Sequence, residues 1–545
     1  MTRGTTAAPP PAADSSAGDP PQLNHRQILT ILSGLMMGML LAALDQTIVG
    51  TAIRTIADDL HGLSLQAWAT TAYLITATIT TPIYGKLSDI YGRKPLYLTA
   101  ISLFLIGSLA CTFADSMYQL AIFRALQGLG AGGLMSLAIT IIGDIVPPRE
   151  RAKYTGYMMS VWGVSSVIGP VLGGLFAGLD SFAGVDGWRW VFLVNVPLGI
   201  VALFVVTKVL NVPHEPRKQR VDWWGAATLA GFLVPLLILA EQGRVWGWTS
   251  ATSLTWLAVA VSSLVAFLLF ERRMGDAALI PLRLFRNSTF TVALIGGFIV
   301  GVAMFGAIML IPQYLQIVQG YSPTEAGLLS LPLMLGIMTS VTIIGRITQN
   351  TGRYKWFPVM GTAAIALGAL LFSRVEWNSP IWQPLVYMAV IGLGLGGCMQ
   401  TLMIAVQNAG PRSDMGVSTA SAVLFRQVGG TLGVAVFLSV LFSTLTGNVR
   451  EAFVSLGVAP SAMTDVAGGV DIMSDSSFLQ QIPLEQAKPF LIGFTDSINL
   501  VFLVAAGVAL LASVVLVFLK EIPLPDPRSQ QAERDRTEMA AATAG

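Results

Sequence analysis

Charged residues are scarce in this sequence, and their scarcity excludes an ordinary soluble protein. Only 11% of the 545 residues are Asp, Glu, Lys or Arg, and 54% are hydrophobic. Soluble domains carry about 25% charged residues. The formal net charge is only +2, so the sequence has no strong electrostatic footprint for nucleic acid. This composition indicates a chain that lies mostly in a membrane.

Cysteine and histidine are scarcer still, which leaves little basis for metal or catalytic chemistry. Cys111 and Cys398 both lie in apolar runs, as expected of small buried residues rather than of a disulfide or a metal pair. The three histidines fall in a terminal segment or in loops, and no metal-ligand spacing occurs. The sequence also lacks the G-x-x-x-x-G-K-[ST] motif that ATP use would require. We therefore expect neither an enzyme nor a protein with a bound metal or cofactor.

Long apolar runs are what the sequence has in abundance. A helix needs about 20 apolar residues to cross the hydrocarbon core of a bilayer. Such windows are found at about 28–52, 66–84, 96–114, 117–142, 153–177, 189–208, 222–240, 252–270, 289–317, 325–345, 356–373, 382–407, 416–443 and 491–519. They predict an all-α integral membrane protein with fourteen transmembrane helices.

The distribution of Lys and Arg predicts the orientation of these helices. The links after the even-numbered windows carry eighteen of these residues, and the links after the odd-numbered windows carry six. Since positive charge favours the cytoplasmic side, both termini are expected in the cytoplasm. Segments 1–27 and 521–545 are predicted to be disordered cytoplasmic tails because of their polar, Pro- and Ala-containing composition. The acidic link 444–490 is predicted to be an external loop.

Two motifs recur at nearly the same offset, which indicates a duplicated half. GKLSDIYGRKP (85–95) and GRITQNTGRYK (345–355) lie 260 residues apart, and GLGAGG (128–133) and GLGLGG (392–397) lie 264 apart. Both glycine strings also match a nucleotide-binding pattern, but within membrane windows close helix packing is the better interpretation. The expected units are a six-helix bundle at 28–210, two inserted helices with their linkers at 211–288, and a second six-helix bundle at 289–520.

Several of these motifs resemble those of a known transporter family. GKLSDIYGRKP resembles the loop signature of the major facilitator superfamily, LAIFRALQGLGAGG (120–133) its fourth-helix motif, and GVSSVIGPVLGG (163–174) the fifth-helix motif of its antiporters. The stretches that resemble the fourteen-helix EmrB/QacA-type drug:proton antiporters are LDQTIVGTAIRTIADDL (44–60), WRWVFLVNVPLG (188–199), VDWWG (221–225) and IPQYLQIVQGYSPTEAGLLSLP (311–332). The resemblance covers about residues 28–520 and implies the major facilitator fold.

Asp45 and Arg124 are isolated charges inside apolar runs. Asp45 either reaches the outer interface or faces a central cavity as a protonatable group. Burial favours the neutral form of a carboxyl group and a nearby cation favours its charged form, so a poised acid could exchange protons with cationic cargo. Arg124 either reaches the lipid headgroups or lies in the cavity, and the resemblance implies a role in proton transfer.

The loop that contains Asp89 and Arg93 has two interpretations. The pair is either an exposed ion pair of little energetic value or part of a conformational latch, with Asp89 at the N-terminus of a helix in the second bundle. In the repeated loop Gln349 stands where the first loop has Asp89, so the two loops need not be equivalent. The predicted latch residues are Gly85, Asp89, Gly92, Arg93 and Arg353.

Two further groups of residues are candidates for the transport pathway. Glycines and a proline in the fifth window are explained either by close helix packing or, as the resemblance implies, by an antiporter hinge that discourages leakage; they are Gly163, Gly169, Pro170, Gly173 and Gly174. A second group could form the walls of a substrate cavity. The alternatives are aromatic residues in the membrane belt and polar contacts inside a bundle. These candidates are Asp45, Gln127, Trp162, Phe305, Tyr314, Gln316 and Arg426.

Together these features predict a secondary active exporter in the cytoplasmic (inner) membrane of a bacterium. It would exchange external protons for amphipathic, often cationic, small molecules by alternating access, driven by the proton gradient and without a cofactor. Its expected partners are these small molecules, protons and the lipid bilayer. One alternative is proton-coupled export of a dedicated endogenous product, such as a lipid, siderophore or antibiotic. The other is a membrane receptor that transports nothing.

Overall fold

A computed structural model describes residues 24–522 and 524, except 61–65, 147–149, 212–221, 276–277, 412–413, 458–478 and 480–481. The described part of the chain is almost entirely helical, and its only strands form a short hairpin, β1 (Ser181–Phe182) and β2 (Val185–Asp186). Most of the two expected tails lies outside the described residues. The expected external loop 444–490 is helical at both ends, because two long helices extend into it.

The helices follow the apolar windows closely. The first group consists of α1 (His25–Asp59), α2 (Gln66–Tyr91), α3 (Arg93–Thr112), α4 (Met117–Ile145), α5 (Arg151–Ala177), the 3₁₀ turn η2 (Gly187–Arg189), α6 (Trp190–Leu193) and α7 (Asn195–Val209). Next come α8 (Trp223–Trp246), α9 (Ala251–Met274) and the 3₁₀ helix η4 (Leu282–Arg286). The last group consists of α10 (Ser288–Gln313), the π-helical turn η5 (Tyr314–Val318), α11 (Pro323–Leu329), α12 (Leu331–Thr351), α13 (Trp356–Phe372), α14 (Trp382–Ala409), α15 (Met415–Ser455) and α17 (Leu484–Val517).

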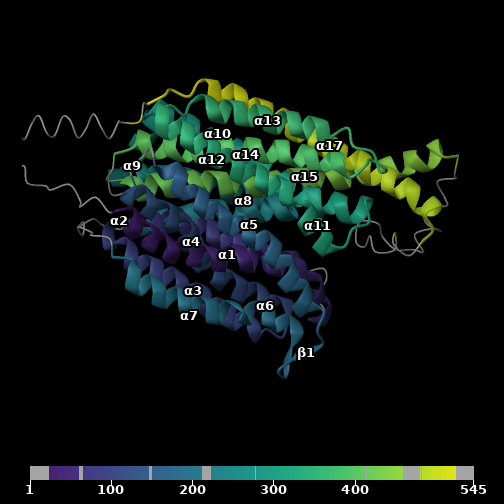
Figure 1. Cartoon of the computed structure of the whole chain (residues 1–545), viewed down its shortest axis with the longest axis horizontal. Coiled ribbons are helices and arrows are strands. Elements are labelled where there is room, and N and C mark those ends of the chain that lie inside the picture. The colour runs from purple at the N-terminus through teal and green to yellow at the C-terminus, as the bar shows by residue number, and fades with distance from the viewer. Residues whose placement is uncertain are drawn as a thin grey trace, which may run out of the picture.

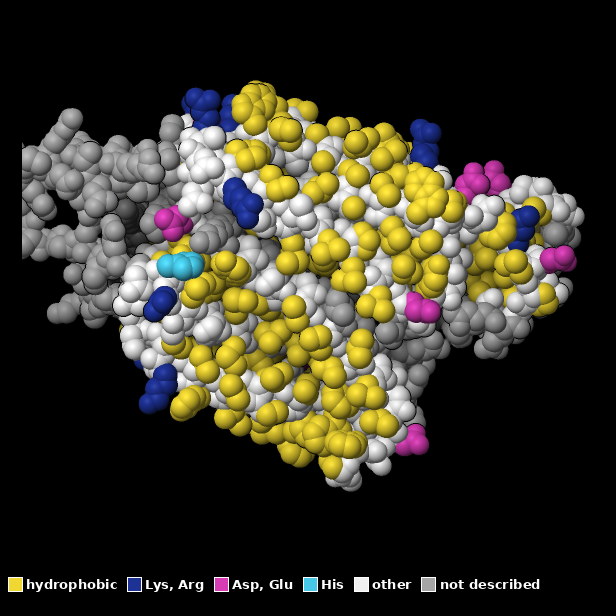
Figure 2. All heavy atoms as spheres, viewed as in Figure 1, with side chains coloured by type: hydrophobic (Ala, Val, Ile, Leu, Met, Phe, Trp, Pro, Cys, Tyr) yellow, Lys and Arg dark blue, Asp and Glu magenta, His cyan; other side chains and the backbone are white. Residues whose placement is uncertain are grey.

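The surface of these helices is that of a membrane protein. Ten helices in the described residues are long and apolar enough to cross a bilayer, and shorter apolar stretches occur at Ser288–Met304 and Trp356–Phe372. Figure 2 shows hydrophobic side chains over the middle of the visible face and charged side chains mainly toward its two ends. Lipid replaces water around such a belt, and helices satisfy their own backbone hydrogen bonds there.

The two groups form two bundles that lie side by side, with α1 to α7 below α10 to α17 in Figure 1. Across the junction, α2 packs against α15 and α5 packs against α12. These two pairs correspond to each other in the proposed repeat, since α2 and α12 are equivalent by the recurring loop motif. The junction is therefore built twice from matching elements.

The two glycine strings form equivalent contacts inside the bundles. A Cβ on Gly132 of α4 would lie 2.3 Å from the carbonyl oxygen of Ala77 in α2. A Cβ on Gly396 of α14 would lie 2.4 Å from the carbonyl oxygen of Ile337 in α12. Real side chains do not fit at these distances, so both strings allow neighbouring backbones to touch, as small residues do in membrane helices.

The inserted pair α8 and α9 covers the junction between the bundles. Its apolar residues, including Leu229 and Phe267, form one cluster with Leu424 and Val428 of α15, and Ile83 of α2 packs against this cluster. The outer face of α9 remains exposed, as expected of a helix that contacts lipid on one side.

Candidate functional site

A group of polar side chains lies deep inside the first bundle. Asp45 comes from α1, Arg124 and Gln127 from α4, and Asn195 from α7, and none of them is more than 1% exposed. Charged and amide groups are costly in an apolar interior, so their placement requires mutual partners.

Asp45 is the centre of this cluster. Arg124 Nη1 donates to Asp45 Oδ2 at 2.6 Å, and both Gln127 Nε2 and Asn195 Nδ2 donate to Asp45 Oδ1 at 2.9 Å. Arg124 also donates to Gln127 Oε1 at 2.8 Å, and its guanidinium lies 4.2 Å from the centre of the Tyr73 ring. The carboxylate thus has three donors and a fully enclosed counter-ion.

The geometry gives the cluster two chemically distinct states. With Asp45 ionised, the charges of Asp45 and Arg124 balance at 2.6 Å. With Asp45 protonated, Arg124 keeps its charge and loses its counter-ion in the bundle interior, and removing one partner of a buried pair costs about 3–5 kcal/mol. The contact between α1 and α4 at this point therefore depends on both charges being present.

The structure brings together residues that the sequence singles out separately. Asp45 and Arg124 are both candidate proton-coupling residues, and they form one ion pair. Asp45 and Gln127, also expected on a cavity wall, are enclosed by the first bundle in this conformation. Asn195 escapes sequence reasoning because a neutral amide in an apolar run carries no charge signal, although it lies within the quoted stretch WRWVFLVNVPLG.

A second polar contact joins the two bundles where α2 ends. Asp89 Oδ1 lies 2.6 Å from Arg93 Nη1, and Asp89 Oδ2 accepts a hydrogen bond of 3.2 Å from the backbone nitrogen of Val417 in the first turn of α15. A carboxylate is favourable there because backbone N–H groups at a helix N-terminus lack partners within the helix. A Cβ on Gly85 would lie 2.6 Å from the Cβ of Ala420, so this approach requires glycine.

We call the end of the molecule that carries this contact the Asp89 end. Gly92, with φ 97°, forms the turn into α3 there, and Arg93 binds Asp144 Oδ2 at 2.7 Å as well as Asp89. A second contact between the bundles is formed by Arg151 Nη1, which donates to Gln407 Oε1 at 3.0 Å.

Arg353, expected in the same latch, is not brought into it. Its side chain is exposed, and none of the described residues forms an ion pair or hydrogen bond with it. The neighbouring backbone nitrogen of Tyr354 instead donates to Glu521 Oε1 at 2.8 Å, within the second bundle. The repeated loop has Gln349 in place of the acid, and among the described residues it makes no contact with the first bundle equivalent to that of Asp89.

The glycines of α5 pack against α1. A Cβ on Gly169 would lie 2.1 Å from Thr47 Oγ1, and one on Gly173 would lie 2.8 Å from the carbonyl oxygen of Ile48. Gly163 faces Met338 of α12, whereas Gly174 is exposed. The side chain of Pro170 lies outside the described residues. In this conformation these glycines act through close packing, and their role as a hinge stays a prediction.

The expected cavity residues separate into different environments. Tyr314 is fully buried in the second bundle, where its hydroxyl donates to the carbonyl oxygen of Glu376 at 3.1 Å and its ring packs edge-on against Phe372. Its place on a cavity wall stays a prediction. Trp162 packs against the core of the first bundle, and Gln316 is partly exposed in η5. The side chain of Phe305 lies outside the described residues.

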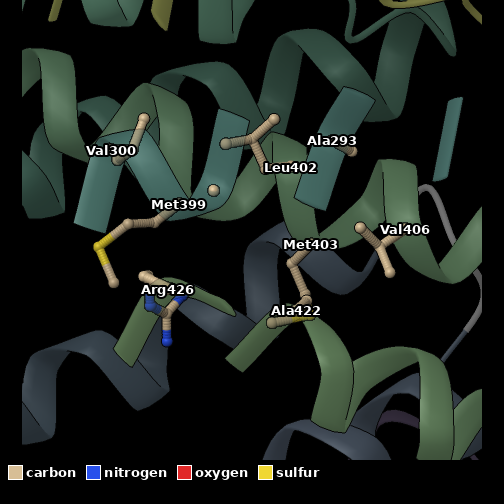
Figure 3. A pocket seen from close by; sticks show the side chains of 9 residues that line it. Ala293, Val300, Met399, Leu402, Met403, Val406, Ala422 and Arg426 are labelled. Atoms are coloured by element: carbon tan, nitrogen blue, oxygen red, sulfur yellow. The ribbon is translucent and has the colours of Figure 1, made fainter. Parts of the chain in front are cut away.

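Arg426 lines a pocket in the second bundle. The other lining residues are Ala293, Gly297, Val300, Met399, Leu402, Met403, Val406 and Ala422. They belong to α10, α14 and α15, and Figure 3 shows Arg426 beside Met399. The volume of this pocket is about 20 Å³, which is enough for about one water molecule.

Known proteins resemble this chain in both sequence and fold. The profile of the Major Facilitator Superfamily matches residues 35–434. The chain belongs to this superfamily. It is 36% identical to an uncharacterised MFS-type transporter of Mycobacterium tuberculosis over 95% of this chain and 73% of that protein. It is 33% identical to the multidrug transporter protein MdtP of Bacillus subtilis, over 94% and 96% of the two chains.

Solved structures of the superfamily share this fold. The proton:xylose symporter XylE matches with a TM-score of 0.58 and 16% identity, over 92% of this chain and 98% of that one. This Major Facilitator Superfamily protein is therefore a multi-pass membrane transporter and not an enzyme. Its similarity to multidrug efflux proteins extends over almost its whole length.

Proposed function

We propose that this transporter is a proton-driven exporter that exchanges external protons for amphipathic compounds by alternating access. The observation that carries the proposal is the enclosed ion pair of Asp45 and Arg124 at 2.6 Å, because it links the protonation of one acid to the arrangement of two helices. Similarity to multidrug transporters of Bacillus subtilis supports export of foreign amphipathic compounds rather than of one dedicated product.

We further propose fourteen membrane-spanning helices, with the Asp89 end and both termini in the cytoplasm of a bacterium. The excess of Lys and Arg in the links at this end supports the orientation. In Figure 2 most Lys and Arg side chains lie toward the end where α1 begins, and most Asp and Glu side chains toward the other. The contacts of Asp89 and Arg151 would then act as the latch that closes the cytoplasmic side.

The charge of the cargo is a separate question. The expectation of cationic cargo rests on the negative charge of Asp45, and this charge is neutralised by Arg124 in the enclosed state. A cation would compete for Asp45 only after the pair has opened. Export of amphipathic compounds therefore requires no positive charge on the cargo.

The test is transport by purified protein in proteoliposomes with an imposed pH gradient. Wild-type protein should move ethidium against its concentration gradient, and Asp45→Asn should reduce the rate to that of empty liposomes. Asp45→Glu, which keeps a carboxyl group, should retain part of the activity. Asp59→Asn is the matched control, because Asp59 lies on the same helix but is exposed and accepts a hydrogen bond from Trp188.

The thermal stability of all three variants in detergent must be compared with that of wild type. Proton-coupled transport by folded Asp45→Asn at the wild-type rate and with the wild-type pH dependence would refute the role of Asp45. If ethidium moves only down its own concentration gradient, at a rate that does not depend on the pH gradient, proton coupling would be refuted.

A further inference from the structure

Arg426 is a positive charge near the middle of the membrane-spanning part of α15. It lies 11 positions after Met415, the first residue of the helix (426 − 415), which corresponds to about 16 Å along the axis. The pocket beside it is otherwise lined by apolar side chains and one glycine. A cation in this position is energetically costly unless it has a partner.

The described part of the chain supplies no such partner. Helices α10 and α14 contain no Asp or Glu, and the first acid after Arg426 on α15 is Glu451, 25 residues later (451 − 426), or about 37 Å along the helix. Among the described residues, none forms an ion pair or a hydrogen bond with the Arg426 side chain.

Two other arginines near the junction are paired with acids. Arg124 is paired with Asp45, and Arg93 is paired with both Asp89 and Asp144, at 2.6 or 2.7 Å. Arg426 differs from these two because no described acid lies against it, so its charge remains available to a molecule that enters the pocket.

We propose that this pocket binds an acidic group of the transported compound, a carboxylate or a similar planar anion, through Arg426. This inference rests on the proposed export function and names the chemistry of its cargo. A guanidinium presents parallel N–H donors that match the two oxygens of a carboxylate, which a point charge such as an ammonium does not. The apolar part of the same compound would lie against Met399, Leu402 and Met403.

The pocket must widen to admit such a compound, and its composition suits this change. In the present conformation it has room for about one water molecule, and the contact of Asp89 with α15 holds the bundles together at one end. Met399 and Met403 are unbranched and flexible, so they can rearrange around cargo of different shapes. An acidic group gains affinity from Arg426 where the compound carries one, and the methionines accommodate apolar compounds with or without it.

The test uses rhodamine B and its ethyl ester, which differ only in whether the carboxylate is free. Binding to purified protein in detergent is measured by fluorescence anisotropy, without a pH gradient. Wild type should bind rhodamine B about tenfold more tightly than the ester, the effect of one hydrogen-bonded charge pair. Arg426→Gln should abolish this preference by weakening rhodamine B alone, and Arg426→Lys should keep part of it.

Arg450→Gln is the matched control, since it removes the same side chain from an exposed position on the same helix and should leave the preference intact. The inference is overturned if wild type does not prefer the free acid. It is also overturned if folded Arg426→Gln loses affinity for both dyes equally, because a structural arginine would have that effect. Proton-driven movement of either dye in proteoliposomes tests the proposed export function separately, since the binding comparison requires neither a proton gradient nor transport.

Discussion

At the residue scale, Asn195 offers a direct test of how the buried acid is controlled. Its side chain donates to Asp45 Oδ1 at 2.9 Å and to Ser108 Oγ at 3.1 Å. Asn195→Ala would remove one of the three donors that hold the Asp45 carboxylate, so it should loosen the cluster. Proton-driven dye transport should then slow about tenfold, since a hydrogen bond to a charged group contributes about 1.5–3 kcal/mol and tenfold corresponds to about 1.4 kcal/mol.

The measurement is the rate of dye transport in proteoliposomes at a constant imposed pH gradient. Asn499→Ala serves as the control, because Asn499 also donates a hydrogen bond inside the protein, to the carbonyl oxygen of Val375, but in the second bundle. An unchanged rate for folded Asn195→Ala would show that this hydrogen bond to Asp45 does not contribute to transport.

Only part of this cluster could be predicted from the sequence. A charge inside an apolar run is conspicuous, so Asp45 and Arg124 can each be singled out from the sequence. Their pairing depends on the rotation and packing of α1 against α4, which hydropathy does not encode. The surroundings of Tyr314 could not be predicted either, since an aromatic residue in a membrane helix has the same sequence signal whether it lines a cavity or packs inside a bundle.

At the scale of elements, the junction of α2 and α15 should control the rate of the conformational change. Asp89 links the end of α2 to the first turn of α15, and Asp89→Asn would weaken both this hydrogen bond and the ion pair with Arg93. The variant should therefore slow turnover several-fold while leaving the affinity for a transported dye nearly unchanged. Transport kinetics in proteoliposomes and equilibrium binding in detergent separate the two quantities.

Asp186→Asn is a suitable comparison for this variant. It removes an ion pair with Arg189 beside the β1–β2 hairpin, where Asp186 is half exposed, and exposed ion pairs contribute little. It should leave turnover unchanged. If Asp89→Asn lowers dye affinity as steeply as turnover, Asp89 belongs to the binding site and the latch interpretation is wrong.

The role of the inserted helices could not be predicted from their sequence. Windows for α8 and α9 are recognisable from hydropathy alone, but the surfaces they cover depend on tertiary packing. Their cluster with Leu424 and Val428 places them over the contact of α2 with α15. Glu271, 1% exposed, also accepts hydrogen bonds from the backbone nitrogens of Leu279 and Ile280, which fixes the linker that leads into the second bundle.

At the scale of the whole molecule, the duplicated architecture is readable from the sequence because each motif has a strict local requirement. Gly92 needs its positive φ, and the two glycine strings need contacts with neighbouring backbones, so each leaves a recognisable pattern at a similar offset. The sequence shows only part of the difference between the contacts of the two repeated loops. The missing acid at Gln349 can be read directly, whereas the contact of Tyr354 with Glu521 depends on where the chain returns after α17.

Alternating access requires that the two bundles separate at the Asp89 end, and the pair α5 and α12 allows this to be tested. A Cβ on Gly156 would lie 3.8 Å from Val341 Cγ1, so cysteines at both positions are near the separation that a disulfide requires. Oxidation of the Gly156→Cys, Val341→Cys double variant should stop transport, because the bundles could no longer part there, and reduction should restore it.

The native Cys111 and Cys398 are buried and unpaired, so each single variant should neither cross-link internally nor lose activity on oxidation. Dye transport is measured before and after oxidation, with the extent of cross-linking followed by gel mobility after cleavage of the loop between the bundles. Full activity in completely cross-linked protein would mean that the bundles need not separate at this end, and a rocking motion about the junction would then be excluded.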